Sequence, residues 1–452
     1  MTALKDRVVS FVDEGLGNSS YLVDIGDGRG LVVDPARHPA PYLAEAERRG
    51  LDIAFAVETH LHADFVSGGR ELEALGAKMV APRAADHAFA TRGLGDGDHL
   101  DLGGLMMRAL AVPGHTPEHL AYLLLDSDRP LALFSGGSLL VGGVARTDLI
   151  DPGQTEALAR KMWRALWQRA LVLPDEVVVY PTHGAGSFCS APGGGPRVTT
   201  IGRERAGNPL LAAADEDDFV RMLIEGLGTY PPYFGRLREL NRGGPVLYGP
   251  GHPVPAHLRA LDVARLAGAG AWVVDARPAE AYARGHIPGS VSIALRPEFA
   301  TWLGWVVPAG APLVFVLEAG DDRAELVRQA RNIGYETILG ELVGGIGSWV
   351  AAGRPTATTA VGPVARASGR VLDVRQAVEF QQGHLPGAVN IELGSLVAAD
   401  VGAGPLSAMC GHGERAMTAA SLLARAGRAD VTVLLGGVND WHAEHGAALS
   451  EP

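Results

Sequence analysis

A pattern that occurs twice constrains the second half of this chain. Residues 273–293 (VVDARPAEAYARGHIPGSVSI) align without a gap on residues 371–391 (VLDVRQAVEFQQGHLPGAVNI). Each copy later closes with a Gly-Gly segment followed by a tryptophan, Trp349 in the first and Trp441 in the second. Repeats of about domain size, in which short strands alternate with helices, predict two α/β modules that are each built on a parallel sheet.

Bulk properties exclude several classes of function. A length of 452 residues predicts about three domains. The net charge of −12 argues against nucleic acid and an anionic membrane as partners. No uncharged apolar run reaches the ~20 residues of a membrane helix, and residues 1–7 do not resemble a signal peptide. Two cysteines far apart in the sequence, Cys189 and Cys410, exclude a disulfide framework and predict a cytoplasmic protein.

The first 250 residues are expected to form a strand-rich α/β domain. Short apolar runs that end in Gly, Pro or Asp predict strands at residues 21–23, 31–33, 78–80, 105–112, 120–125 and 177–180. Helical periodicity covers residues 154–170, and an acidic turn at 215–218 predicts a second helix that ends near Leu227. Residues 189–208 are rich in Gly and Pro, so we expect a long loop there.

Potential metal ligands follow the ends of several of these strands. After the apolar run 53–57, three polar residues alternate, and two more histidines arrive from Pro-Gly-His and Pro-Thr-His segments; the five are His60, His62, Asp64, His115 and His183. Such residues predict a metal site with open coordination positions. Burying five polar side chains together is costly unless a metal or water satisfies them, so we expect a bound metal.

The first half resembles persulfide dioxygenases fused to rhodanese domains, within the metallo-β-lactamase superfamily. The resemblance rests on residues 58–68 (ETHLHADFVSG), 15–21 (GLGNSSY) and 181–189 (PTHGAGSFC). It implies an αββα sandwich followed by two rhodanese-like α/β domains. The expected boundaries are 1–250 for the metallo-β-lactamase-like domain, 251–356 for an inactive rhodanese-like domain and 361–452 for an active one.

The superfamily's two-metal site implies one role for each candidate ligand. One metal would be held by residues at 60, 62 and 115, the other by residues at 64, 65 and 183, with an aspartate at 137 bridging both. Phe65 has no donor atom, so a second metal would lose a ligand. This departure also fits the one-iron fusion proteins.

In persulfide dioxygenases, the single iron is held by residues that correspond to His60, His115 and position 137. Position 137 is Gly137, in FSGGS, so the carboxylate of that triad is missing. The resemblance therefore implies one Fe(II) per chain, with zinc less favoured, and His62 or Asp64 as substitute ligands. The alternative is a decayed site on a structural scaffold.

The repeated modules resemble rhodanese domains, whose reaction needs a cysteine at the head of a loop of backbone N–H groups. The second copy has this loop, CGHGER, from Cys410 to Arg415, and a helix-forming stretch follows it. Backbone dipoles and a cation stabilise a thiolate and its persulfide, so we predict that Cys410 is the sulfur carrier and Arg415 the cation. The matching loop of the first copy, LEAGDDR at 317–323, has no cysteine, so that copy is expected to be inactive.

The resemblance implies persulfide and sulfane-sulfur handling, in sulfide oxidation or detoxification. Expected partners are a low-molecular-weight thiol persulfide, sulfite or thiosulfate, and further copies of the chain in a homo-oligomer. Two alternatives remain open: a metal-dependent thioester hydrolase of the glyoxalase II type, and a persulfide-binding scaffold with sulfurtransferase activity alone. Arg146 could contact an anionic substrate or could equally be a solvated loop residue, whereas Cys189 is expected to be buried and structural. The identity of the carrier thiol stays open.

Overall fold

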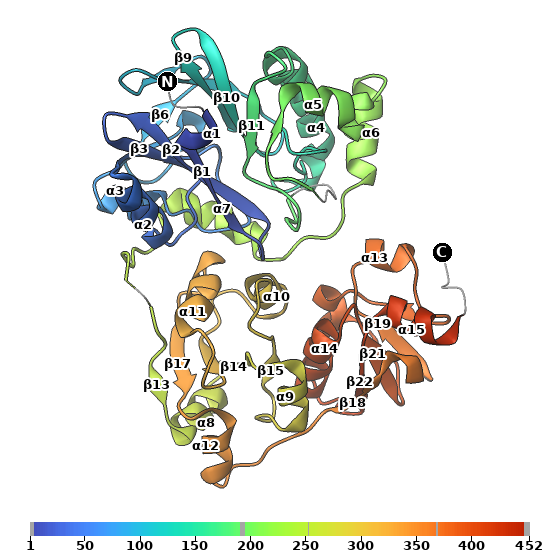
Figure 1. Cartoon of the computed structure of the whole chain (residues 1–452). Helices are drawn as coiled ribbons and strands as arrows, with labels where there is room; N and C mark the ends of the chain where they lie inside the picture. The colour runs from blue at the N-terminus through green and yellow to red at the C-terminus, as the bar shows by residue number, and fades with distance from the viewer. Residues whose placement is uncertain (1–3, 190–194, 252, 368, 447–452) are drawn as a thin grey trace. The chain divides into compact units, whose positions relative to one another are not determined.

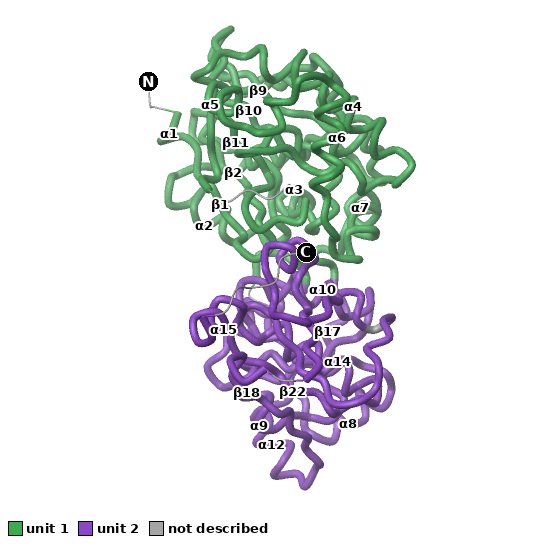
Figure 2. The backbone as a smooth tube through the Cα atoms, turned by 90° about the vertical axis from the view of Figure 1, so that its right-hand side faces the viewer, with its two compact units in different colours: residues 1–252, 331–334 green, residues 253–330, 335–452 purple. Residues whose placement is uncertain are grey.

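The computed structural model describes residues 4–189, 195–251, 253–367 and 369–446. The chain forms two compact units, residues 1–252 with 331–334 and residues 253–330 with 335–452 (Figure 2). In the described part of the chain, no helix is long and apolar enough to cross a bilayer.

Unit 1 contains two six-stranded sheets. The first has the order β1 (Val8–Asp13), β2 (Asn18–Gly26), β3 (Arg29–Val33), β4 (Asp52–Val57), β5 (Lys78–Pro82) and β6 (Arg92–Leu94). The second has the order β12 (Thr199–Thr200), β11 (Val178–Pro181), β10 (Arg129–Gly136), β9 (Leu120–Asp126), β8 (Met106–Ala111) and β7 (His99–Asp101). These elements include every strand that the apolar runs predict.

Helices cover the outer faces of both sheets (Figure 1). Apolar side chains from the two sheets meet in one buried core, with Tyr21, Phe134 and Tyr180 in mutual ring contact. A second core joins the first sheet to α2 (Ala40–Arg49) and α3 (Gly69–Ala74), and a third joins the second sheet to α4 (Thr155–Ala165) and α6 (Glu216–Glu225). These layers confirm the αββα sandwich. The other helices of the unit are α1 (Leu4–Arg7), α5 (Ile201–Gly207) and α7 (Phe234–Gly243).

The expectation of a long loop over residues 189–208 is wrong in its second half. β12 pairs with β11, and α5 follows it directly, with the Thr200 side chain accepting a hydrogen bond from the Arg203 N–H. Ile201 is fully buried and anchors the start of this helix in the core. Gly and Pro are concentrated before Arg197, so the composition of the whole stretch hid a short helix at its end.

Unit 2 contains two five-stranded parallel sheets with the same topology. The first has the order β13 (His257–Leu258), β17 (Ile338–Leu342), β16 (Leu313–Val316), β14 (Trp272–Asp275) and β15 (Val291–Ser292). The second has the order β18 (Ala360–Pro363), β22 (Val431–Leu435), β21 (Leu406–Met409), β19 (Arg370–Asp373) and β20 (Val389–Asn390). In each, the first strand in sequence lies next to the fifth, which confirms two repeated α/β modules.

The helices of unit 2 also occur in two sets. The first module contains α8 (Ala260–Gly268), α9 (Ala279–Arg284), α10 (Phe299–Val306), α11 (Arg323–Asn332) and α12 (Gly345–Ala351). The second contains α13 (Ala377–Gln381), α14 (Glu414–Arg425) and α15 (Val438–His445).

Residues that the two copies of the repeat share form the same buried ion pair in both modules. An Arg277 Nη2–Asp275 Oδ2 contact of 2.6 Å in the first module is matched by an Arg375 Nη2–Asp373 Oδ2 contact of 2.6 Å in the second. Each arginine also donates to the glycine carbonyl of the Gly-His pair, at 2.9 Å in both cases. The shared Asp-x-Arg and Gly-His residues therefore have a structural role, since they hold the strand end against the following segment in both modules.

Candidate functional site

Three buried histidines meet at one edge of the second sheet of unit 1. β8, β10 and β11 run in the same direction, so the loops after them leave from one edge. His115 follows β8 and His183 follows β11, while His60 comes from the loop after β4 of the other sheet. A ring nitrogen of each lies within 4.8 Å of the other two, and each residue is at most 2% exposed.

A hydrogen-bond relay fixes the tautomer of His60. The Thr59 hydroxyl donates to Asp34 Oδ2 at 2.8 Å. The Oγ1 of this hydroxyl also lies 2.8 Å from His60 Nδ1. Because the hydroxyl proton is used on Asp34, Thr59 can only accept from His60, so Nδ1 carries the proton. The lone pair of His60 is therefore on Nε2.

His115 and His183 are held in the same tautomer by other acceptors. His115 Nδ1 lies 2.8 Å from the carbonyl oxygen of Arg146, which can only accept. His183 Nδ1 lies 3.1 Å from Asp64 Oδ2 and 3.2 Å from Asn18 Oδ1. The Nε2 atoms of all three histidines are buried and have no hydrogen-bond partner among the described residues.

This donor set fits a divalent transition metal. Burial lowers the pKa of His60 well below its usual value, and it lowers that of His115 to about 3, so both rings are neutral. Neutral imidazoles with an oriented lone pair suit zinc, iron, copper and nickel, and an acceptor on the other ring nitrogen is the usual support of a metal ligand. Without a cation or bound water, three such nitrogens would remain buried and unsatisfied.

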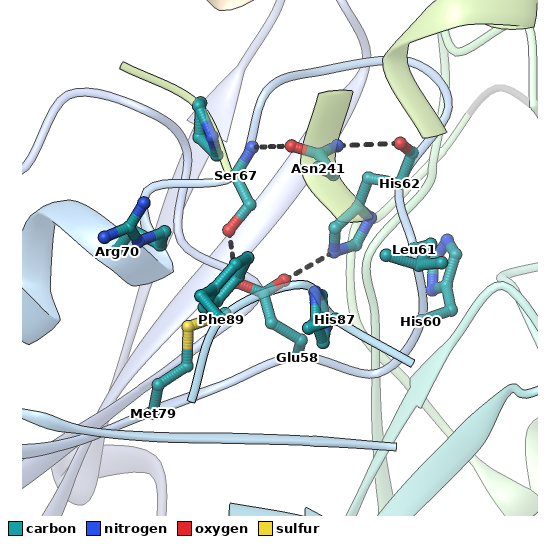
Figure 3. A pocket seen from close by; sticks show the side chains of 11 residues that line it. Glu58, His60, Leu61, His62, Ser67, Arg70, Met79, His87, Phe89 and Asn241 are labelled. Carbon is teal, nitrogen blue, oxygen red and sulfur yellow. Dashed lines mark hydrogen bonds and ion pairs between the residues drawn. The ribbon is translucent and has the colours of Figure 1, made fainter. Parts of the chain in front are cut away.

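His62, the next candidate ligand, turns toward two carboxylates. Figure 3 shows its ring beside Glu58, where Nε2 lies 3.0 Å from Glu58 Oε2, and Asp34 Oδ1 lies 3.3 Å away. Burial disfavours a charged ring, but the two carboxylates outweigh it and raise the pKa of His62 to about 10. The cavity beside His62 has a volume of about 10 Å³, which is room for a single water molecule.

Asp64 supports His183. Burial would raise the pKa of the Asp64 carboxyl, but the adjacent His183 brings it down to about 2, so the group is ionised. The two residues form the carboxylate–histidine pair that commonly orients a metal-bound imidazole.

The second candidate site is the loop that carries Cys410, between β21 and α14 in unit 2. The Gly413 N–H donates to Cys410 Sγ at 3.1 Å, directly at the start of the twelve-residue helix α14. Gly413 has φ of +116°, a conformation that favours glycine, and a Cβ there would lie 2.8 Å from Leu435 Cδ2. The loop therefore aims the Gly413 N–H at the sulfur, beside the N-terminus of α14.

The matching loop of the first module is held by hydrogen bonds between its own residues. Asp321 accepts from the Glu318 N–H at 2.7 Å, and Arg323 donates to the carbonyl oxygens of Glu318 and Asp321. This loop presents carboxylates and no thiol.

Comparison with known proteins identifies the domains. The model of the metallo-beta-lactamase superfamily matches residues 13–183. Human persulfide dioxygenase ETHE1, a mitochondrial protein, is 30% identical over 208 residues, which are 45% of this chain and 75% of the human protein. The chain belongs to the metallo-beta-lactamase superfamily. The rhodanese-like domain model matches residues 260–352 and 357–444, so two rhodanese-like domains follow the metallo-beta-lactamase domain.

Two further relatives extend this comparison. The hydroxyacylglutathione hydrolase of Rhodopseudomonas palustris (strain BisB18) is 34% identical over 227 residues, 50% of this chain and 81% of that protein. A crystal structure of a metallo-beta-lactamase from Staphylococcus aureus subsp. aureus COL superposes with a TM-score of 0.66, at 29% identity, covering 74% of this chain and 98% of that one.

The metallo-beta-lactamase domain brings all five expected ligand residues together, but in two groups. His60, His115 and His183 form one group, and His62 and Asp64 form another that also includes His183. Phe65 is buried against the ring of His62, with 4.3 Å between the ring centroids, and offers no donor atom.

Arg146 is neither solvated nor available to a substrate. It is 4% exposed, forms a two-point ion pair with Asp148 at 2.7 Å, and lies 4.3 Å from the centroid of the Tyr230 ring. Its backbone carbonyl is what orients His115. Cys189 is fully buried, and burial raises the pKa of its thiol, so this thiol stays protonated.

Several residues whose side chains contact the candidate histidines were not given this role from the sequence. They are Asp34, Thr59, Asn18 and Glu58. Asp34 carried one available signal: it stands at a strand end before Pro35, and it adopts φ of +47°, which Asp tolerates better than most residues. Asn18 lies 165 residues from its partner His183, a distance that no local pattern reveals.

Proposed function

We propose that this protein transfers and oxidises sulfane sulfur. In this proposal, the metallo-beta-lactamase domain acts on a low-molecular-weight thiol persulfide, and Cys410 carries sulfur between that chemistry and thiosulfate. The observation that supports it most is the Gly413 N–H donated to Cys410 Sγ at the start of α14, in a domain that matches the rhodanese-like model.

The step at Cys410 is a sulfur exchange. The Cys410 thiolate attacks the outer sulfur of thiosulfate, an S–S bond forms to Cys410, and sulfite leaves with the electron pair of the broken bond. The Gly413 N–H and the N-terminal dipole of α14 stabilise the negative charge before and after this exchange. In reverse, sulfite removes the sulfur and restores the thiolate.

The metallo-beta-lactamase domain would supply the sulfite. A thiol persulfide, O₂ and water give the thiol, sulfite and two protons, so O₂ is the oxidant and the outer sulfur is oxidised. A transition metal, when bound, supplies an electrophilic centre with positions open to small molecules. His60, His115 and His183 would hold it, while Thr59, Arg146 and Asp64 keep their Nδ1 protons in place. The similarity to a human protein named as a persulfide dioxygenase supports this role.

The sulfur-carrier role is tested by intact-protein mass spectrometry after incubation with thiosulfate. We expect a gain of one sulfur mass that cyanide removes as thiocyanate, and its loss in Cys410→Ser. Cys189→Ser is the matched control, because it removes the chain's other thiol without touching the loop. Equal loading of wild type and Cys410→Ser would contradict the proposal.

Thioester hydrolysis is the second candidate for the metallo-beta-lactamase domain. The similarity to a hydroxyacylglutathione hydrolase over 81% of that protein favours it, and a three-histidine set is a known support of a metal-activated water. Phe65 argues against a second metal ion. Metal-loaded protein that cleaves a glutathione thioester, and takes up no O₂ with a thiol persulfide, would replace the dioxygenase proposal with this one.

A further inference from the structure

The geometry points to a rearranged metal site: one divalent transition-metal ion held by His60, His115 and His183, with His183 in place of the missing carboxylate at 137. This inference deepens the proposed function and rests on it for the use of the metal. The experiments below measure metal binding alone. A wrong ligand assignment can therefore be distinguished from a wrong proposal for the sulfur chemistry.

The space beside Gly137 is already filled. A Cβ at this position would lie 2.5 Å from His115 Cδ2, 2.9 Å from His115 Cγ and 3.1 Å from Ala145 Cβ. The His115 ring cannot shift without losing the hydrogen bond from its Nδ1 to the Arg146 carbonyl. The glycine is therefore more than a deleted ligand, because the imidazole occupies the volume that a side chain would need.

The backbone of Gly137 is fixed as well. Its N–H donates to His119 Nε2 at 2.9 Å, and the preceding Gly136 has φ of +57°. A Cβ at Gly136 would lie 2.4 Å from the same His119 nitrogen. Neither glycine can present a side chain to the site with its neighbours where they are.

His183 has the features of the replacement ligand. Its Nδ1 donates a hydrogen bond to Asn18 Oδ1 at 3.2 Å and also faces the Asp64 carboxylate, with Oδ2 at 3.1 Å. Its Nε2 is buried, has no hydrogen-bond partner in the described ranges, and belongs to a ring grouped with His60 and His115. Asp64 changes role accordingly, from a direct ligand to the carboxylate that orients one.

A metal at the other group is disfavoured. That group would combine His62, Asp64 and His183, but its Asp64 oxygen already faces the protonated Nδ1 of His183. The Nε2 of His62 is engaged by Glu58 at 3.0 Å. His62 Nδ1 and Asp64 Oδ1 also lack a hydrogen-bond partner among the described residues, but a second ion there would have to share His183 with the first group, so we infer one metal per chain.

The first test counts ligands in the wild-type chain. Protein stripped with a chelator is loaded with Zn²⁺ or Co²⁺ alone, and X-ray absorption at the metal edge measures the imidazoles bound. We expect one metal per chain with three imidazoles. Two imidazoles, or two metals per chain, would overturn the inference, and no variant has to fold for this result.

The second test uses variants and a competing chromophoric chelator. His183→Ala and the milder His183→Gln are expected to weaken Zn²⁺ affinity by more than about 100-fold, since even outer contacts change it by about 10- to 100-fold. His62→Gln should stay within about threefold of wild type. Unchanged affinity in a folded His183 variant would overturn the assignment.

The variant Gly137→Asp distinguishes the three-histidine site from a site that has simply lost its ligand at position 137. If position 137 were an empty ligand position, the new carboxylate would tighten Zn²⁺ binding. We expect weaker binding, by about 10-fold or more, because the side chain displaces His115. Gly235→Asp is the control for an added charge, since Gly235 is exposed and a Cβ there meets nothing within 4 Å. Tighter binding by Gly137→Asp would overturn the inference.

Discussion

Arg415 and Glu379 form a two-point ion pair beside the Cys410 loop. Arg415 Nη1 lies 2.6 Å from Glu379 Oε2, and Nη2 lies 2.8 Å from Oε1. The guanidinium also lies 5.3 Å from the centroid of the Trp302 ring, which belongs to the first rhodanese-like domain. Burial disfavours the charged form of Glu379, but Arg415 outweighs it and lowers the pKa of the carboxyl. The cation that the loop sequence provides is therefore largely neutralised.

Removing that carboxylate should speed sulfur loading. In Glu379→Gln the charge of Arg415 is no longer balanced, so a thiolate and an anionic donor are both stabilised at the loop. The pair is partly exposed and is worth no more than about 1 kcal/mol, so we expect a rise of about two- to fivefold in the second-order rate constant with thiosulfate. The measurement is stopped-flow sulfite release.

Glu444→Gln is the control for this comparison. It removes one exposed carboxylate from the same domain, on α15, and should leave the rate constant unchanged. Arg415→Ala should lower the rate constant. A slower Glu379→Gln would mean that the ion pair is needed to hold Arg415 in place.

Thr59→Val should weaken metal binding without removing a ligand. The substitution keeps the shape of the side chain but deletes the oxygen that accepts from His60 Nδ1. We expect a loss of about 10- to 100-fold in Zn²⁺ affinity, measured by chelator competition. Thr182→Val is the matched control, because Thr182 also donates to Asp34, whereas the hydrogen bond of His60 Nδ1 is made with Thr59. Equal losses in both variants would assign the effect to Asp34 instead.

Breaking one repeated ion pair should destabilise the second rhodanese-like domain. Arg375→Ala leaves the fully buried Asp373 carboxylate without its partner, and such a loss costs about 3–5 kcal/mol. A lower urea midpoint in tryptophan fluorescence is the expected result. Arg259→Ala, which removes an arginine whose side chain is 79% exposed from a surface pair, should cost less than about 1 kcal/mol. Similar midpoints for the two variants would contradict this prediction.

Acid should weaken the first rhodanese-like domain through His286. Burial lowers the pKa of His286, whose ring stacks on Tyr282 at 3.8 Å. Below the unfolded value of about 6.5, the unfolded chain takes up a proton that the folded ring resists, so stability is lost as the pH falls from about 7 toward 5. The free energy of unfolding, taken from denaturation curves at several pH values, should depend less on pH in His286→Gln than in wild type. The slopes should differ by at most about 1.4 kcal/mol per pH unit. Parallel pH profiles would refute the assignment to this histidine.

The sequence predicted the architecture because its signals are local and repeated. Two gapless copies of one pattern require one topology twice, and both modules place their strands in the same order. The candidate site residues could be found because they follow strand ends of the two packed sheets, which meet in space. What each residue does there could not be predicted, since it depends on partners far away: Glu379 lies 36 residues from Arg415, and Asn18 lies 165 from His183. The short helix α5 was hidden by the composition of the segment before it.

The packing at Gly137 limits which substitutions the site can accept. A side chain introduced at position 137 would meet the His115 ring. A donor at this position therefore needs a second, compensating change that makes room beside His115. Single substitutions at 137 are expected to disturb the site before they can add to it.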